Sequence, residues 1–356
     1  MSSTTRALPP NHRSAAAFEQ YVSGHRALDD GVVFLLESGD AFETVRRAAE
    51  PGDVIFAPDE ETTHDTTGVT VIGYHGRFQH PGDEVTLDGR HTFELQDYLA
   101  APFISIVGLT VVRQGSAEGL AAYFADADTA RRSGVFVEQL LHRAVLLDSR
   151  ASFGTPDAAS DLVRVHVTAD GALRDGPDGH FLGEAGTGRC ELLAAAESGE
   201  GAGRAFARII EQDDFDAAMG ARPWMTRYAV ALDLLRHGEP SAARPQISGF
   251  GGYLASALHD TDLPDVVDAD APFLLWDDDG DHTLIDPRTR RRFRLGREAA
   301  VAVECLIAAG EREAATDLFA VELGATAATS VEAVAEIDRR FAGVGIDLTA
   351  FGRGAS

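Results

Sequence analysis

The sequence contains no lysine, because all 31 basic residues of the 356-residue chain are arginine. A Walker A loop binds phosphate groups through a lysine, and pyridoxal phosphate is held by a lysine Schiff base. Both kinds of site are therefore excluded. The glycine-rich phosphate loop of dinucleotide-binding proteins is missing too, since only Ser38-Gly39-Asp40 separates the first expected strand from its helix.

Cysteine and long apolar runs are also scarce. The two cysteines, Cys190 and Cys305, fit a reducing compartment, and neither has an evident base partner for nucleophilic catalysis. No apolar run approaches the roughly 18 residues that a membrane-spanning helix needs. The N-terminus lacks the apolar core of a signal peptide. We therefore expect a cytoplasmic protein with no membrane partner.

Negative charge outweighs positive charge over the whole chain, and the formal net charge is −26. Such a chain is repelled by phosphate backbones, so we expect no nucleic-acid partner. The length exceeds what one hydrophobic core usually serves, which favours two domains.

The expected domain order is an N-terminal arm, a large domain, a linker and a small domain. Residues 1–28 predict a loose arm with a short helix, Ser14–Ser23. Residues 29–238 predict a mixed α/β domain of unknown role. Residues 239–271 are rich in Pro, Gly, Ser and Asp and predict a linker, and residues 272–350 form the second domain.

Strand and helix patterns alternate in the large domain. The order strand, helix, strand at its start favours a parallel or mixed sheet. Strands are expected at 31–37, 53–57, 69–73, 103–112 and 162–167, helices at 41–49, 117–132, 135–147, 190–197, 203–212 and 223–236, and an extended loop at 168–188.

The last part of the chain shows three short strands followed by three helices. The strands are expected at 273–276, 283–285 and 291–295, and the first two helices at 298–309 and 311–323. The third helix has a capping-box start, Thr329 with Glu332 three residues on. The fold class is therefore α+β, with an N-terminal mixed α/β domain and a C-terminal winged helix-turn-helix of three antiparallel strands and three helices.

This C-terminal segment resembles the PqqD-like RiPP recognition element, which binds leader peptides of ribosomally synthesised and post-translationally modified peptides (RiPPs). The resemblance is carried by the turn Leu284-Ile-Asp-Pro287, the step Phe293-Arg-Leu-Gly296 into a helix, and the ending Gly345-Ile-Asp347. With the element at its C-terminus, the chain is similar to the recognition protein of daptide-type clusters. The resemblance implies a non-catalytic protein without cofactor that delivers its precursor to an oxidative decarboxylase, an aminotransferase and a methyltransferase.

Arginine gathers around the third expected strand of this segment. The set is Arg288, Arg290, Arg291, Arg292, Arg294 and Arg297. Charged side chains on an edge strand discourage aggregation, but that purpose needs fewer charges. We therefore favour a docking edge for an acidic leader peptide, which would add as a further strand. The expected peptide-binding residues are Arg290, Arg291, Arg292, Phe293, Arg294 and Leu295, with Val331, Val334, Ala335 and Asp338 on the last helix.

Two other functions remain open. A winged helix could serve a DNA-binding regulator whose N-terminal domain senses a ligand, although Glu332, Glu336 and Asp338 on the last helix oppose binding to phosphates. Alternatively, the chain is a RiPP-modifying enzyme whose catalytic domain is residues 30–238.

Metal and phosphate sites have weak support. The histidine-rich stretch matches no ligand spacing, so we expect loop histidines and no metal there. The residues concerned are His64, Asp65, His75, His80 and His91. The acidic run Asp277–Asp281 fails the calcium-loop pattern and predicts a turn. The glycine-rich Ser248–Tyr253 predicts a flexible hinge rather than a phosphate loop.

Overall fold

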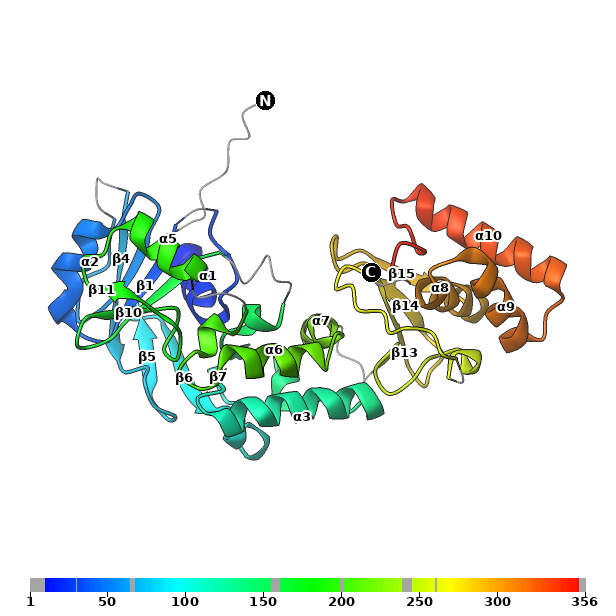
Figure 1. The fold of residues 1–356 in the computed structure, drawn as a ribbon, viewed down its shortest axis with the longest axis horizontal. Coiled ribbons are helices and arrows are strands. Elements are labelled where there is room, and N and C mark those ends of the chain that lie inside the picture. The colour runs from blue at the N-terminus through cyan, green and yellow to red at the C-terminus, as the bar shows by residue number, and fades with distance from the viewer. Residues whose placement is uncertain are drawn as a thin grey trace, which may run out of the picture. The chain divides into compact units, whose positions relative to one another are not determined.

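The computed structural model describes residues 10–29, 31–64, 68–154, 161–198, 202–238, 245–259 and 261–351. The chain forms two compact units. Unit 1 comprises residues 1–123 and 138–221, and unit 2 comprises residues 124–137 and 222–356. Figure 1 shows the elements of both.

Unit 1 is built on one mixed sheet. Ten strands follow one another across it in the order β11-β10-β9-β1-β2-β4-β5-β6-β7-β8, and β3 pairs beside β4. The strands are β1 (Val33–Leu36), β2 (Val54–Pro58), β3 (Thr63–His64), β4 (Thr70–Gly76), β5 (Glu84–Leu87), β6 (His91–Asp97), β7 (Leu109–Arg113), β8 (Val145–Leu147), β9 (Arg164–Val167), β10 (Ala172–Arg174) and β11 (Phe181–Glu184).

Most of these strands run in one direction. Strand β1 is parallel to β2 and β9, and β2 is parallel to β4. The antiparallel hairpin β5–β6 then restores the direction, so β6, β7 and β8 are parallel to β1. The carboxyl ends of β1, β6, β7 and β9 therefore lie at the same edge of the sheet.

Alternate side chains of the buried strands serve two separate cores. Val33 and Leu35 of β1 pack with Phe18 of α1 (Pro10–Ser23), in a cluster that draws residues from most strands between β1 and β7. Phe34 and Leu36 pack on the opposite face, against α2 (Phe42–Ala48) and α5 (Arg189–Ser198). Helix α1 contacts β8 and β9 as well as β1, so the sheet curves round it. The sequence predicted only a short helix in a loose arm here.

Several elements of unit 1 differ from the prediction. The expected helix 135–147 is a 3₁₀ turn, Gln139–Leu141, followed by β8. The expected loop 168–188 contains the hairpin β10–β11. Its strands are short, and the glycine and aspartate residues at its turns favoured the prediction of a loop. The expected helix 203–212 is a 3₁₀ turn, Ala202–Phe206, before α6 (Gln212–Gly220). Of the expected strand 103–112, only residues 109–112 are in a strand, β7, which ends at Arg113. The expected parallel start, β1-α2-β2, is confirmed.

Unit 2 consists of a four-stranded antiparallel sheet with helices, which confirms the α+β class. The sheet order is β12-β13-β14-β15. Its strands are β12 (Gln246–Ile247), β13 (Phe273–Trp276), β14 (His282–Ile285) and β15 (Arg292–Leu295), and its helices are α7 (Met225–Arg236), α8 (Arg297–Ala309), α9 (Arg312–Leu323) and α10 (Ala327–Gly343), with the end of α3 (Ala117–Ser133). Leu274 and Leu284 on one sheet face pack with the apolar faces of α8–α10. Figure 1 shows these three helices beside the sheet.

The sequence prediction missed the fourth strand and misplaced one helix start. Strand β12 has only two residues and lies in a Pro- and Gly-rich stretch, where composition favours a linker. Helix α10 begins after Thr326, whose side chain accepts a hydrogen bond from the Thr329 amide. Thr329 is therefore inside the helix, because Ala327 and Ala328 extend it towards the N-terminus.

Residues 245–259, expected to be linker and hinge, are packed in unit 2. The carboxylate of Glu304 in α8 accepts hydrogen bonds from Ser248 Oγ at 2.6 Å, the Leu254 amide at 2.9 Å and the Ala255 amide at 2.7 Å. Burial raises the pKa of Glu304 above the usual range of a carboxyl group. Gly251 has a φ of +82°, and a Cβ there would lie 2.5 Å from the Gly134 nitrogen. Close packing therefore accounts for this glycine.

Within the part of the chain that the structure describes, no single helix is long and apolar enough to cross a membrane. Helices α9 and α10 reach that length and composition only as a pair, across a bend of 119°.

Candidate functional site

The predicted docking edge is β15, the last strand in the order of the four-stranded sheet. Its register pairs Arg292 with Ile285 and Phe293 with Leu284. The Asp286 amide donates to the Arg291 carbonyl at 3.0 Å, which fixes which pairs are hydrogen-bonded. Bonded and non-bonded pairs alternate along an antiparallel ladder. The backbone N–H and C=O groups of Phe293 and Leu295 therefore hydrogen-bond to β14, whereas those of Arg292 and Arg294 point away from it.

The side chains of β15 divide between the two sheet faces. Phe293 and Leu295 are half-buried against the core below α8–α10, and the Phe293 ring lies 5.3 Å from that of Phe341 in α10. Arg292 and Arg294 are exposed on the other face, beside a cavity of about 270 Å³ that Leu235 of α7 also lines. The strand thus offers an apolar and a cationic side.

The arginines of the edge are held to different degrees. Arg291 Nη2 donates to the Val344 carbonyl at 2.8 Å. Arg292 Nη2 donates to the carbonyl of His237, at the C-terminal cap of α7, at 3.4 Å. Arg290 lies in the preceding turn with a φ of +58°. No partner of the Arg294 side chain is found among the residues that the structure describes, so this guanidinium is available for a ligand.

Helix α10 supplies fewer exposed groups than the sequence predicted. Val331 is 56% exposed and Ala335 is half-buried. Val334 is fully buried in the core, and Asp338 is buried with its carboxylate accepting from Arg312 Nε at 3.0 Å. Of the four α10 residues predicted to bind peptide, Val334 and Asp338 are therefore buried within unit 2.

The histidine-rich stretch forms no metal site among the described residues, where no group of three or more potential ligands occurs. Asp65 lies outside the described residues. His75 pairs with Asp59 at 3.1 Å on the surface. Asp277 Oδ1 accepts from the amides of Asp279 and Asp281, which confirms the predicted turn.

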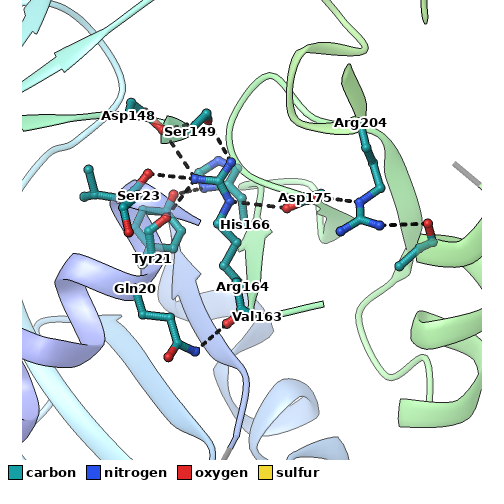
Figure 2. Close-up of polar contacts among 12 residues, drawn as sticks. Gln20, Tyr21, Ser23, Asp148, Ser149, Val163, Arg164, His166, Asp175 and Arg204 are labelled. Atoms are coloured by element: carbon teal, nitrogen blue, oxygen red, sulfur yellow. Dashed lines mark hydrogen bonds and ion pairs between the residues drawn. The ribbon is translucent and has the colours of Figure 1, made fainter. Parts of the chain in front are cut away.

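Unit 1 contains a buried chain of charges that the sequence did not reveal. Arg164 of β9 lies at its centre (Figure 2). Its Nε donates to Asp175 at 3.2 Å, its Nη1 donates to the carbonyls of Tyr21 and Val22 at the end of α1 at 2.9 Å each and to Asp148 at 3.3 Å, and its Nη2 donates to Ser149 Oγ at 2.8 Å. A cation at a helix C-terminus is favourable.

The chain extends from Arg164 in both directions. Arg204 donates to the second oxygen of Asp175, and Arg113 Nε donates to the second oxygen of Asp148 at 2.6 Å. All five side chains are at least nine-tenths buried, with Arg113 8% exposed. Burial opposes the charge of Asp148, but Arg113 and Arg164 outweigh that effect and hold its pKa below the usual range. Three arginines and two aspartates leave one positive charge in excess.

A cavity of about 350 Å³ lies beside the Arg113 end of this chain. The residues that line it include Glu37, Asp97, Arg113 and Thr168, which lie at or just after the carboxyl ends of β1, β6, β7 and β9. Ligands of open α/β sheets bind in crevices at this edge. The cavity volume suits a small molecule.

Two buried side chains hold Glu37 in this cavity. His166 Nε2 lies 2.9 Å from Glu37 Oε1, and its Nδ1 lies 2.8 Å from the Tyr21 hydroxyl (Figure 2 shows Tyr21 and His166). The hydrogen bond from His166 lowers the pKa of Glu37, and burial lowers the pKa of His166. Glu37 is therefore ionised and His166 neutral near pH 7, with Nε2–H donating to Glu37.

Sequence reasoning identified the strand that carries Arg164 and His166 but not their role. Both alternate with valines in a strand that is buried on both faces, which is the one local signal. Their partners Tyr21, Asp148 and Asp175 are distant or unremarkable in sequence. Comparison of the chain with protein-family models, with curated proteins and with solved structures gave no match.

Proposed function

We propose that unit 2 binds an extended peptide by strand addition at β15. The observation that carries the proposal is the open edge, where the backbone groups of Arg292 and Arg294 point away from β14. An added strand would satisfy these groups and gain affinity that depends little on sequence. The finer fold description, a winged helix-turn-helix of the PqqD-like kind, is part of this proposal.

Specificity would come from the two sides of the strand. Alternate side chains of the added strand point to opposite faces. One set would meet the Phe293 and Phe341 rings, and the other would meet Arg292 and Arg294. Acidic residues in the second set would gain charge-assisted hydrogen bonds. The chain is otherwise strongly acidic, so these arginines would also orient an acidic peptide as it approaches.

The peptide in this account is the leader of a RiPP precursor, as the resemblance to daptide-type recognition proteins implies. The protein would perform no chemistry in this role. It would raise the local concentration of precursor near separate enzymes, namely an oxidative decarboxylase, an aminotransferase and a methyltransferase. A short precursor gene and genes for these enzymes beside this gene are expected.

DNA binding is less well supported by unit 2. Glu332 is exposed on α10, and Arg339 and Arg340 both pair with Glu336. Together Glu332 and Glu336 balance the two arginines, so this surface has no net positive charge and gains little from phosphates. The remaining alternative, an enzyme in residues 30–238, has one feature in its favour, the charged cavity of unit 1.

The test is binding of a fluorescein-labelled acidic leader peptide, measured by anisotropy. Reversal of two charges, Arg292→Glu with Arg294→Glu, should weaken binding at least about 100-fold, because each charge-assisted hydrogen bond is worth roughly 1.5–3 kcal/mol and about 1.4 kcal/mol is a factor of ten. Arg46→Glu with Arg47→Glu, on α2 of unit 1, changes the net charge equally and should bind as wild type.

Thermal melting must accompany the measurement, because Arg292 also donates to the cap of α7. The single variant Arg294→Glu leaves the hydrogen bond to the cap of α7 intact and should weaken binding at least about tenfold, the value of one charge-assisted hydrogen bond. Normal affinity in both β15 variants, with unchanged melting, would show that the peptide docks elsewhere.

A further inference from the structure

Glu37 is a carboxylate that buried neighbours hold in place beside the unit 1 cavity. His166 Nε2 lies 2.9 Å from its Oε1, and the Ala169 amide donates to its Oε2 at 2.9 Å. Each carboxylate oxygen can accept two hydrogen bonds, so each oxygen retains one acceptor site. The Glu37 side chain is 18% exposed and lines the cavity. Locked partners behind a partly exposed polar group are what a ligand-binding site requires.

Arg113 also lines the cavity, but the protein itself engages its guanidinium. Its Nε donates to Asp148 at 2.6 Å. Its guanidinium carbon lies 5.2 Å from the centre of the Phe78 ring, within the range of a cation–π interaction. An anion in the cavity would therefore gain little from Arg113.

Carboxylates outnumber the other positive charges at the cavity. Three carboxylates line it, on Glu37, Asp97 and Asp178. The positive charges beside them are the exposed guanidinium of Arg208 and the one excess charge of the buried chain. One negative charge is left when all three carboxylates are ionised. Burial raises the pKa of Asp178 above the usual carboxyl range, but a bound cation favours its ionised form. The cavity therefore suits a ligand with one positive charge.

The rest of the lining indicates which kind of cation fits. No group of three or more potential metal ligands occurs among the described residues, which disfavours a metal ion. The free acceptor sites of Glu37 suit a cation that carries N–H donors, as a primary ammonium group does. Phe78, Pro81 and Leu95 supply apolar surface for a carbon chain.

We propose that the unit 1 cavity binds a small aliphatic primary amine in its ammonium form, with the ammonium on Glu37. The cavity of about 350 Å³ lies at the edge where ligands of open α/β sheets bind. A free amino acid fits less well, because its carboxylate would meet a lining with more carboxylates than free arginines. This inference does not rest on peptide binding by unit 2.

The experiment is isothermal titration calorimetry of the full chain with propylamine, butylamine, pentylamine and hexylamine. A pH of about 8 keeps exposed histidines neutral and these amines charged, and salt at about 0.15 M screens general attraction to an acidic protein. At least one amine should bind. The alcohol of the same chain length, tetramethylammonium and magnesium ions should each bind at least about tenfold more weakly.

Glu37→Gln tests the anchoring residue. It keeps the size of the side chain and removes the charge, so amine binding should weaken at least about tenfold, the value of one charge-assisted hydrogen bond. Glu43→Gln is the matched control, because Glu43 is exposed on α2 of unit 1 and its loss changes the net charge equally. This variant should bind as wild type.

Arg208→Gln tests the sign of the ligand charge. Arg208 is exposed, so its substitution should spare the fold. Removal of a positive charge from the lining should tighten amine binding at least about threefold, because like charges repel. A folding defect cannot mimic a gain in affinity. The matched control Arg47→Gln, also exposed on α2, should leave binding unchanged.

Four results would each overturn the proposal. The first is that none of the amines binds, and the second is that the alcohol, tetramethylammonium or magnesium binds as tightly as the amine. The third is a folded Glu37→Gln variant that binds as wild type. The fourth is an Arg208→Gln variant whose affinity for the amine is unchanged or weaker.

Discussion

Arg164 is 1% exposed and makes five hydrogen bonds, to Asp148, Asp175, Ser149 and two carbonyls at the end of α1. A buried guanidinium is tolerated only when its donors are satisfied and its charge is paired. Arg164 meets both conditions by joining β9 to α1 and to the segment after β8. It therefore links β9 and the segment after β8, which are far apart in the order of the sheet, through the end of α1.

Asp148 is the residue whose loss should test this network. Asp148→Asn leaves Arg113 and Arg164 with one buried counter-charge fewer, and breaking a buried pair costs about 3–5 kcal/mol. The unfolding free energy at pH 7, measured by urea denaturation, should fall by that amount. Arg26→Gln, which removes an exposed pair with Asp161, should change it by less than about 1 kcal/mol.

The same variant should show a characteristic pH dependence. The folded-state pKa of Asp148 is lowered, so its stabilisation is complete above the unfolded pKa near 4 and is lost as pH falls through the lower folded value. The stability difference between wild type and Asp148→Asn should therefore be constant from about pH 5 to 7 and shrink below about pH 4. A difference that stays constant down to pH 3 would mean that folding does not lower the pKa of Asp148.

Sequence reasoning was weakest for such residues. The pattern Leu162-Val-Arg-Val-His-Val167 predicted a strand, and β9 confirms it. It could not predict that Arg164 meets Tyr21, because this contact depends on how the sheet curves round α1. For Val334 the sequence did contain the signal. This residue belongs to the apolar stripe of α10, and the structure buries it in the core.

At the scale of elements, regular patterns were predicted well and short irregular ones were not. Strands β13–β15 and helices α8 and α9 lie within about one residue of their expected bounds, because alternation and helical periodicity repeat over several residues. Strand β12 has two residues and no such pattern. It forms because its backbone can hydrogen-bond to β13, and the hydrogen bond from the Ser248 amide to the Leu274 carbonyl continues this pairing.

This difference predicts which fragment of unit 2 is stable. A fragment that begins at residue 245 keeps β12, the contacts of Glu304 and the buried Leu258. A fragment that begins at residue 272 loses them. Burial of one leucine side chain is worth about 1.5–3 kcal/mol, and each lost hydrogen bond about 1 kcal/mol. The longer fragment should be more stable by at least about 3 kcal/mol in urea denaturation. Equal midpoints for the two fragments would show that residues 245–259 are only a linker.

At the scale of the whole molecule, each unit offers one distinct site. Unit 2 has an open strand edge with an apolar and a cationic side, suited to an extended peptide. Unit 1 has a cavity whose lining carries both carboxylate and arginine side chains. The sequence resemblance addressed only the first, because it rests on short turns and strand ends in the last part of the chain. The second requires residues from four strands to meet, which no local pattern records.

The most direct test of strand addition is amide hydrogen exchange in the full chain, resolved by residue with NMR, with and without a saturating acidic leader peptide. In the free protein, the amides of Phe293 and Leu295 should exchange slowly because they bond to β14, whereas those of Arg292 and Arg294 should exchange fast. Peptide binding should slow Arg292 and Arg294 at least tenfold and leave the unit 1 amides unchanged. If the peptide saturates the protein while Arg292 and Arg294 still exchange fast, the peptide does not add to β15 and the account is wrong.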